Sequence, residues 1–549
     1  MKPRFLANRR DALKALTSCV LAPPLAAGAL LGAGATDVWA AADGVSERTL
    51  SLAIGGAVTT IDPHFYSNGP NNSVARHFFE RLVGRTAKAT LVPELALSWQ
   101  AVSDTVWEFK LRPGIKWHDG KDFTADDVEF TIKRIPNVPN SPGGFAGLVR
   151  VIRKIEVVDP LTIRFHTPNP YPLLPTDLTN IGIVSRHVGE GASTADYNSG
   201  KAAIGTGPFV FKSYQPGSRI EMVRNESYWG PKPAWSKVDF RIISNGAART
   251  AALLSGDVDL IDAVPTPDLQ KLRQDARVRV SETPSLRVIY LTLDRSRDSN
   301  VPFVSDRDGK PLPTNPFNDV RVRRALNISI NRQALVDRIM EGMAVPTGQW
   351  LPAGLFGHNP DVAVPAYDPE MAKKLLAEAG YPNGFRLTLH TSNDRYPNDA
   401  MVAQAVAQMW TRVGVQTAVE AIPFSVFSTR VARQEFAAGL RGWGSGSGEA
   451  SFVLREILTT FDASASQGTN NPMRYSNKAL DAAIAETIRT VDDVKRETLL
   501  RAAVKMAADD VGIISLFMLK NAWASKKDIE IDARMDELTV SSGVRMVKG

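Results

Sequence analysis

Between residues 368 and 441 the sequence alternates between helical and strand patterns, and this alternation restricts the fold more than any other feature. Asp368-Pro369-Glu370 predicts a helix start, because Asp caps helices and Pro fits the first turn. Strands separated by helices are expected to be parallel, with right-handed crossovers. The segment therefore predicts an α/β fold. The expected strands are 385–389, 415–421 and 436–441, separated by a helix over 400–413 and a helix capped by Ser425.

In an open α/β sheet, ligands bind beyond the carboxyl ends of the strands. Two loops of this segment, 390–396 and 441–449, occupy such positions. Earlier in the chain, a strand over 50–54 leads to Thr59 and Thr60, and a second strand leads to Asn245. Loops from two lobes that converge on one cleft are what a clamshell binding protein needs.

Residues 1–42 resemble a cleaved secretory signal. A basic head is followed by a soft apolar run and by the small residues Ala40-Ala41-Ala42, which predicts a mature start at Asp43 and a periplasmic location. Asn8 to Lys14 resembles the twin-arginine export motif, with general secretion as the alternative. A lipoprotein box ending at Cys19, the sole cysteine, is a weaker alternative because the apolar run before it is short.

The composition without this leader is that of an ordinary soluble protein. Removal of the leader leaves 507 residues, enough for about three domains. The formal net charge falls from +7 to about +4, and no basic face interleaved with aromatic residues appears, so nucleic-acid binding is not supported. The absence of cysteine after residue 42 excludes disulfides and thiol catalysis there.

Motifs spread along the chain point to one family. The segment Leu91–Arg134 joins a Pro-Glu-Leu-Ala turn, the alternating strand 106–111, a tight turn and an Asp-rich helix start. Further motifs are Thr59 to His64, Gly205-Thr206-Gly207-Pro208-Phe209, Arg224 to Gly230 and Phe317 to Leu326. In this order they resemble the peptide-type, family 5 solute-binding proteins of bacterial ABC importers.

The resemblance implies the periplasmic-binding-protein type II fold, an α/β two-lobe clamshell with an extra N-terminal subdomain. The lobes would be joined by hinge strands at 286–293 and 513–518. It also implies a monomer that is not an enzyme, needs no cofactor, and delivers a small molecule to an ABC permease and its ATPase. The implied domains are lobe I (43–70, 204–284 and 512–549), the extra subdomain (71–203) and lobe II (285–511).

Trp443 occupies the position of a family tryptophan that lines the ligand cleft. The Gly and Ser residues that follow it, including Ser445, are expected to leave the indole face uncovered. Where peptide-binding relatives carry an Asp for the peptide's α-amino group, this chain has Gly446. Either Glu449 or Asp394 replaces that carboxylate, or the ligand has no free α-amino group there.

Other expected ligand contacts follow from the same loops. Thr59 and Thr60 would form the opposing lobe, and Asn393 and Arg395 would supply polar contacts. Arg395 is equally compatible with a plain surface position. The segment Leu91–Arg134 is expected to build part of the subdomain core, through Trp107 among others, and it need not touch the ligand.

Patterns for other chemistry are absent or weak. Gly205-Thr206-Gly207 lacks the third glycine of a dinucleotide-binding loop. The run at 444–448 is not a nucleophile elbow, because its central residue is Gly where that motif needs a nucleophile. The seven histidines show no metal-binding spacing. The sequence thus favours a solute receptor, with a ligand-presenting sensor partner or a periplasmic hydrolase as alternatives. Oligopeptides and other polar small molecules both stay open as ligands.

Overall fold

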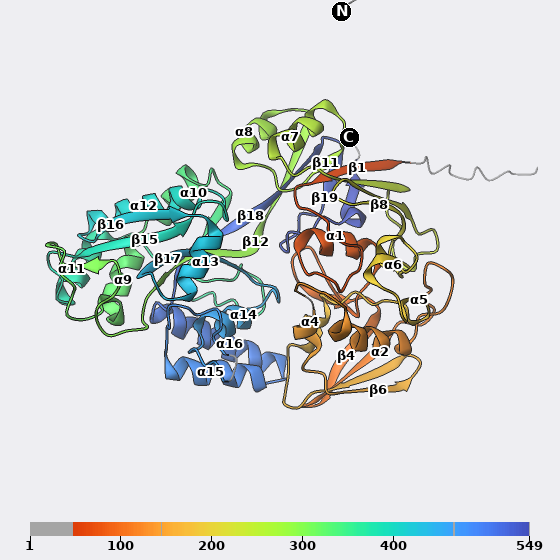
Figure 1. Ribbon diagram of the computed structural model, residues 1–549, viewed down its shortest axis with the longest axis horizontal. Helices are drawn as coiled ribbons and strands as arrows, with labels where there is room; N and C mark the ends of the chain where they lie inside the picture. The colour runs from red at the N-terminus through yellow and green to blue at the C-terminus, as the bar shows by residue number, and fades with distance from the viewer. Residues whose placement is uncertain (1–47, 144, 465–466, 548–549) are drawn as a thin grey trace, which may run out of the picture. The chain divides into compact units, whose positions relative to one another are not determined.

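The computed structural model describes residues 48–143, 145–464 and 467–547 (Figure 1). The predictions for residues 1–42, namely the signal peptide, its cleavage site, the export motif and the lipoprotein box, lie outside these residues. No helix within the described ranges has the length and apolar character needed to span a membrane.

One sheet of 12 strands runs through most of the described chain. Its main path has the order β13-β15-β17-β12-β18-β11-β1-β10-β9-β8, while β14 pairs with β18 and β16 pairs with β15. The strands are β1 (Thr49–Ile54), β8 (Phe209–Gln215), β9 (Arg219–Arg224), β10 (Lys237–Ile242), β11 (Leu260–Ile261), β12 (Val278–Leu293), β13 (Val304–Ser305), β14 (Ala344–Pro346), β15 (Arg386–Ser392), β16 (Gln416–Ile422), β17 (Ala438–Gly444) and β18 (Ile514–Lys526).

The strands β12 and β18 lie side by side and are longer than the hinge strands expected from the sequence (Figure 1). Their antiparallel register shifts between Pro284 and Val288, where the proline ring leaves the backbone without an N–H to donate. The strand β18 contributes to four separate buried clusters, through Phe517, Met518, Ala522 and Trp523 respectively. These two strands therefore link regions that are otherwise packed independently.

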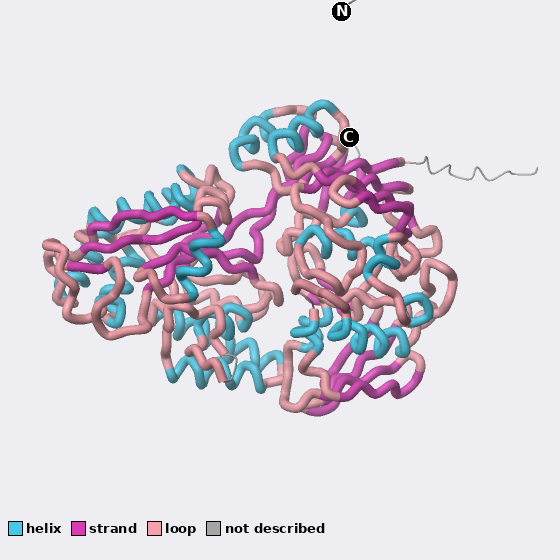
Figure 2. The backbone as a smooth tube through the Cα atoms, viewed as in Figure 1, coloured by secondary structure: helices cyan, strands magenta, loops and turns pink. Residues whose placement is uncertain are grey.

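The β-α-β-α-β segment is confirmed. The strand β15 pairs in parallel with both β16 and β17, and α12 (Asp399–Arg412) packs on β15 and β16. Helices flank these strands in Figure 2. The helix α11 (Pro369–Glu378) begins as predicted, since the Asp368 side chain accepts a hydrogen bond from the backbone N–H of Met371.

The helix start predicted at Ser425 is wrong. The helix α13 (Phe424–Ala432) begins after Pro423, and Ser425 lies inside it. The carboxylate that accepts the Phe424 N–H is that of Asp394, at 2.8 Å, from the loop after β15. A side chain distant in sequence thus takes the capping role that the local pattern gave to Ser425.

A second, four-stranded antiparallel sheet has the order β4-β5-β7-β6. Its core buries Trp107, Phe109 and Leu111, as the alternation at 106–111 predicted. The helix α2 (Ala125–Arg134) packs beside β6 and begins with a reciprocal capping box between Thr124 and Asp127. The strands are β4 (Ala96–Ser103), β5 (Val106–Leu111), β6 (Lys154–Asp159) and β7 (Thr162–His166).

Shorter strands and the remaining helices surround these sheets. The short strands are β2 (Val83–Arg85), β3 (Leu91–Pro93), β19 (Ile529–Ile531) and β20 (Val544–Met546). The other helices are α1 (Gly69–Phe78), α3 (Ala146–Val149), α4 (Leu174–Leu178), α5 (Arg186–Gly189), α6 (Thr194–Asn198), α7 (Gly246–Ser255), α8 (Thr266–Gln274), α9 (Val320–Ile328), α10 (Arg332–Arg338), α14 (Ser451–Val453), α15 (Lys478–Arg489) and α16 (Asp493–Asp509), with single turns η1 (Ile135–Asn137), η2 (Pro316–Asn318), η3 (Leu454–Leu458) and η4 (Ser541–Gly543).

Candidate functional site

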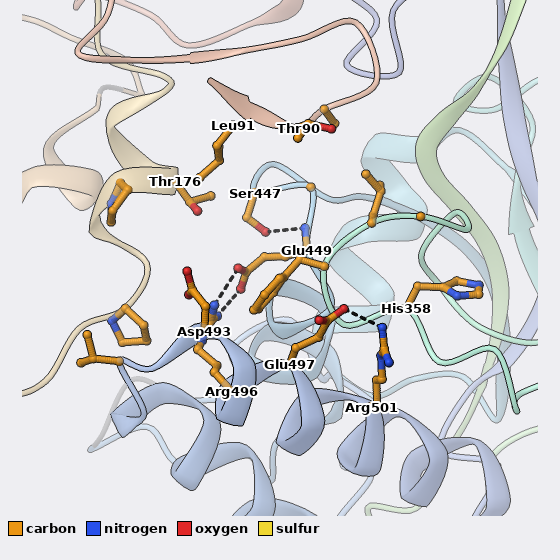
Figure 3. A pocket seen from close by; sticks show the side chains of 18 of the residues that line it. Thr90, Leu91, Thr176, His358, Ser447, Glu449, Asp493, Arg496, Glu497 and Arg501 are labelled. Atoms are coloured by element: carbon orange, nitrogen blue, oxygen red, sulfur yellow. Dashed lines mark hydrogen bonds and ion pairs between the residues drawn. The ribbon is translucent and has the colours of Figure 1, made fainter. Parts of the chain in front are cut away.

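A cavity of about 780 Å³ lies between two parts of the chain that are far apart in sequence (Figure 3). Its size is in the usual range for small-molecule sites. One wall, here called the apolar wall, is formed by Ala89, Thr90, Leu91, Trp99, Gln100, Ala101, Trp107, Pro172, Pro175 and Thr176. The other, here called the charged wall, is formed by Ala353, Gly354, Leu355, Phe356, His358, Pro360, Ser447, Gly448, Glu449, Val491, Asp493, Arg496, Glu497 and Arg501.

The apolar wall is an edge of the four-stranded sheet and its surroundings. Trp99 on β4 and Trp107 on β5 lie on the face of that sheet that carries the buried core. The Trp107 indole N–H donates to the backbone carbonyl of Tyr171 at 3.0 Å, which fixes its ring. Leu91 reaches the cavity from β3 and Pro175 from α4. This wall contains no ionisable side chain.

The charged wall is built around a buried ion pair. The Arg496 guanidinium on α16 donates to both carboxylate oxygens of Glu449, at 3.0 and 2.5 Å, and both side chains are almost fully buried. Its Nε donates to the backbone carbonyl of Thr487 at 3.2 Å, and the hydroxyl of Ser451 also donates to Glu449. The pair is therefore satisfied within the wall itself.

Three more ionisable side chains of this wall face the cavity. Figure 3 shows Asp493, Glu497 and Arg501 along one side of α16, with Leu91 and Thr176 across from them. Glu497 pairs with Arg501 at 2.7 Å. Burial and the neighbouring carboxylates, Glu449 among them, raise the pKa of Asp493 against the attraction of Arg496.

His358 also lines the charged wall. Burial and the nearby Arg501 lower the pKa of its imidazole below 6.5, so the ring is neutral at pH 7. Within the described part of the chain, no group of three His, Cys, Asp or Glu side chains is placed to hold a metal ion.

A guanidinium from β2 joins the two walls. Arg85 donates to the backbone carbonyls of Gly446 and Ser447, at 3.0 Å each, and is nearly buried. Ala89 lies against Gly448, where an added Cβ would be 3.4 Å from the Ala89 Cβ and where the φ of +72° favours glycine. The glycine-rich loop thus gives room for close approach of the opposite wall.

Trp443 is half-buried, and its role as a ligand contact stays a prediction. The strand β17 continues to Gly444, so Trp443 is a strand residue paired with Val288. Its indole packs against Phe452, with ring centroids 5.8 Å apart, and its N–H is buried without a hydrogen-bond partner in the described residues. Ser445 is also buried, and its hydroxyl accepts from the Gly448 N–H at 3.1 Å.

The predicted contacts of the other lobe are engaged in local hydrogen bonds. The backbone N–H of Thr59 donates to Asn71 at 2.8 Å, and the Thr60 hydroxyl donates to Asn198 at 3.0 Å. Asn393 is exposed, and its backbone N–H donates to the carbonyl of Ile422.

Arg395 is exposed and lies over the rings of Tyr396 and Phe424, at 5.5 and 5.4 Å. It lines a second cavity of about 460 Å³, together with Arg287 and Lys520. Of the seven predicted site residues, Glu449 alone lines the larger of these two cavities, and Arg395 alone lines the smaller. Neither of these two cavities is therefore lined by more than one of the seven residues, and their role as ligand contacts stays a prediction.

Sequence reasoning missed Trp99, Asp493 and Arg496. The spacing of Asp493, Glu497 and Arg501, four residues apart, marks one face of a helix and was the available signal. The segment Leu91–Arg134, for which the sequence required no ligand contact, contributes Leu91, Trp99 and Trp107 to the lining of the larger cavity.

Comparisons with known proteins agree with the fold. The sequence model described as bacterial extracellular solute-binding proteins, family 5 Middle, matches residues 90–465. Heme-binding protein A of Haemophilus influenzae is 29% identical over 467 residues, covering 79% of this chain and 80% of that protein. The dipeptide-binding protein of Escherichia coli is 28% identical over 489 residues, covering 84% and 87%.

Among solved structures, HbpA2 from Haemophilus parasuis superimposes with a TM-score of 0.78 at 24% identity, covering 91% of this chain and all of that one. The fold class expected from the sequence, a periplasmic-binding-protein type II fold, is thereby confirmed.

Proposed function

The chain belongs to family 5 of the bacterial extracellular solute-binding proteins, and from this premise we propose that it is the periplasmic solute receptor of an ABC importer. In this role it captures a small solute in the 780 Å³ cavity and delivers it to the importer's permease. The signal peptide over residues 1–42, the monomeric state and the lobe boundaries at 70, 203, 284 and 511 are part of the proposal.

The observation that carries the proposal is the cavity with walls from two distant parts of the chain. Leu91 and Trp99 face Asp493 and Arg496, and Arg85 and the loop near Ala89 join the walls through the contacts described above. A solute that contacts both walls favours the arrangement in which they are close, which is a shift of population toward the closed form. The permease then recognises that form.

The residues expected from the sequence take different parts in this proposal. Glu449 acts as the anchor of Arg496 in the charged wall rather than as a free carboxylate. Ser445 holds the glycine-rich loop through the hydrogen bond from the Gly448 N–H, and Trp443 packs against Phe452 beside that loop. Arg395 contributes to a second contact region beside Arg287, and Thr59, Thr60 and Asn393 are proposed to contact the solute only through rearrangement of their present hydrogen bonds.

Native mass spectrometry of protein purified from the periplasm tests the proposal. We expect the wild-type protein to retain a small molecule, and the cavity-filling variant Thr90→Trp to lose it, because Thr90 lines the cavity and its side chain can be enlarged there. The matched control is Lys88→Trp, an exposed neighbour that does not line the cavity. Retention by Thr90→Trp, or loss by both variants, would contradict the assignment of the cavity.

A further inference from the structure

The charges that line the 780 Å³ cavity do not balance. Three carboxylates, Glu449, Asp493 and Glu497, face two guanidinium groups, Arg496 and Arg501, and His358 is neutral at pH 7. The opposite wall has no ionisable group. The lining therefore carries one excess negative charge.

The excess charge is located at Asp493. Glu449 shares both of its oxygens with Arg496, and Glu497 is bound by Arg501 at 2.7 Å. Each of these pairs is neutral as a unit. Among the residues the structure describes, the Asp493 carboxylate has no hydrogen-bond or ion-pair partner, and Figure 3 draws it beside the Glu449–Arg496 pair with no dashed line of its own.

The surroundings make this carboxylate responsive to a cation. The side chain is accessible to a solute. Partial burial among protein atoms and the nearby carboxylates nevertheless raise the pKa of Asp493. A cation placed beside the ionised carboxylate would therefore stabilise it. The amino-terminal end of α16 offsets about half a unit charge. The exposed Asp492 caps that helix end, and its carboxylate counteracts the partial positive charge of the helix end.

The rest of the cavity suits an apolar body. Trp99, Trp107 and Leu91 lie on one side, and Leu355, Phe356 and Val491 on the other. An indole face also attracts a cation, so the two tryptophans are compatible with a cationic group in the cavity. An anionic solute would gain nothing from the charged wall, because both guanidinium groups are already bound by carboxylates.

We propose that the cavity binds a solute with one cationic group on a mainly apolar body, and that Asp493 is the carboxylate that pairs with the cation. This inference rests on the proposed function as a solute receptor and specifies the chemical class of its ligand. Because Asp493 is the one charged side chain of the described lining without an ion-pair partner, it determines the sign of the ligand that is accepted.

Two fluorescent probes with one fluorophore and opposite charges test the inference. Dansylcadaverine carries an ammonium group, and dansylglycine carries a carboxylate. We expect the wild-type protein to bind dansylcadaverine at least about tenfold more tightly than dansylglycine, measured as dansyl fluorescence enhancement. We expect Asp493→Asn to remove about tenfold of that preference.

The matched control is Asp492→Asn. It removes one negative charge from the adjacent position, and asparagine retains the ability to cap α16. It should keep the wild-type preference, and circular dichroism melts should show both variants folded. Equal or tighter binding of dansylglycine, failure of both probes to bind, or an equal effect of the two variants would overturn the inference.

The result is separable from that of the proposed function. If the periplasmic protein retains an anionic solute that the Thr90→Trp variant loses, the receptor role stands and the ligand class is wrong. If no solute is retained while dansylcadaverine binds through Asp493, the cavity chemistry stands and the receptor role is the part that fails.

Discussion

The two walls of the cavity differ in the interactions that fix their side chains before a solute arrives. The apolar wall is held by packing on a sheet, with Trp99 and Trp107 continuous with a buried core. The charged wall is held by ion pairs that are satisfied internally, such as Glu449 with Arg496. The comparison shows that many charges near a cavity need not mean many charged contacts with a ligand, since here all but one are neutralised within the wall.

The largest effect is expected when the internal pairing of the charged wall is broken. Arg496→Ala leaves Glu449 buried without its partner, which should lower the free energy of unfolding by about 3–5 kcal/mol. Urea denaturation measures it. The double variant Glu449→Leu with Arg496→Met removes both charges and should recover most of the loss. A double variant as unstable as Arg496→Ala would show that packing, rather than charge, holds this wall.

The apolar wall has a carboxyl group behind it, and pH should reveal that group. Burial raises the pKa of Asp177, on α4, to about 7, while Tyr171 donates to it at 2.7 Å. Its protonated form stabilises the fold fully below pH 3.8, and this contribution is lost as the pH rises through 7. Between pH 5 and pH 8 the free energy of unfolding of the wild-type protein should therefore fall by about 2–3 kcal/mol more than that of Asp177→Asn.

Chemical denaturation of both proteins across this pH range checks the prediction. Asp126→Asn, an exposed aspartate of α2, is the control and should follow the wild-type pH dependence. Parallel curves for wild type and Asp177→Asn would mean that the carboxyl is ionised in the folded protein.

Truncation of the apolar wall should weaken binding more than folding. Trp99→Ala removes a half-buried indole from the cavity, and the affinity for dansylcadaverine should fall about tenfold, or about 1.4 kcal/mol. Leu97→Ala on the same strand removes an exposed side chain that does not line the cavity and should leave the affinity unchanged. Fluorescence titration compares them, and equal losses would place the probe elsewhere.

The smallest effect is expected at the exposed pair of the charged wall. Arg501→Ala breaks a 2.7 Å pair with Glu497 in which both side chains are partly exposed, and the free energy of unfolding should change by about 0–1 kcal/mol. Urea denaturation beside Arg496→Ala makes the contrast direct. A loss as large as that of Arg496→Ala would contradict the distinction between buried and exposed pairs on this helix.

The elements that depend on local periodicity were predictable. The alternation at 385–389 and 415–421 identified β15 and β16, and Asp368 identified the start of α11. The start of α13 was not predictable, because the group that caps it, Asp394, comes from another loop. A local sequence pattern can indicate only hydrogen bonds between residues close in sequence. A capping residue that comes from another loop therefore gives no signal in the sequence of the helix that it caps.

The lining of the larger cavity was harder to predict than the fold for a similar reason. Alternation identified Trp107 as a core residue, but it could not show that this core opens toward α16 at its edge. Glu449 was found because it follows a strand, whereas its partner Arg496 lies in a helix with no motif. The cavity is a product of long-range packing, which no single segment encodes.

The position of β18 in the sheet also sets the order in which the protein is completed. This strand lies between β12 and β11 and supplies side chains to four buried clusters, but it is among the last segments to be synthesised. At about 5–20 residues per second, the chain between β12 and β18 takes roughly 10–45 s to make. During that interval none of these four cores has the side chains that β18 supplies, whereas the core of the four-stranded sheet takes none from β18 and can form earlier.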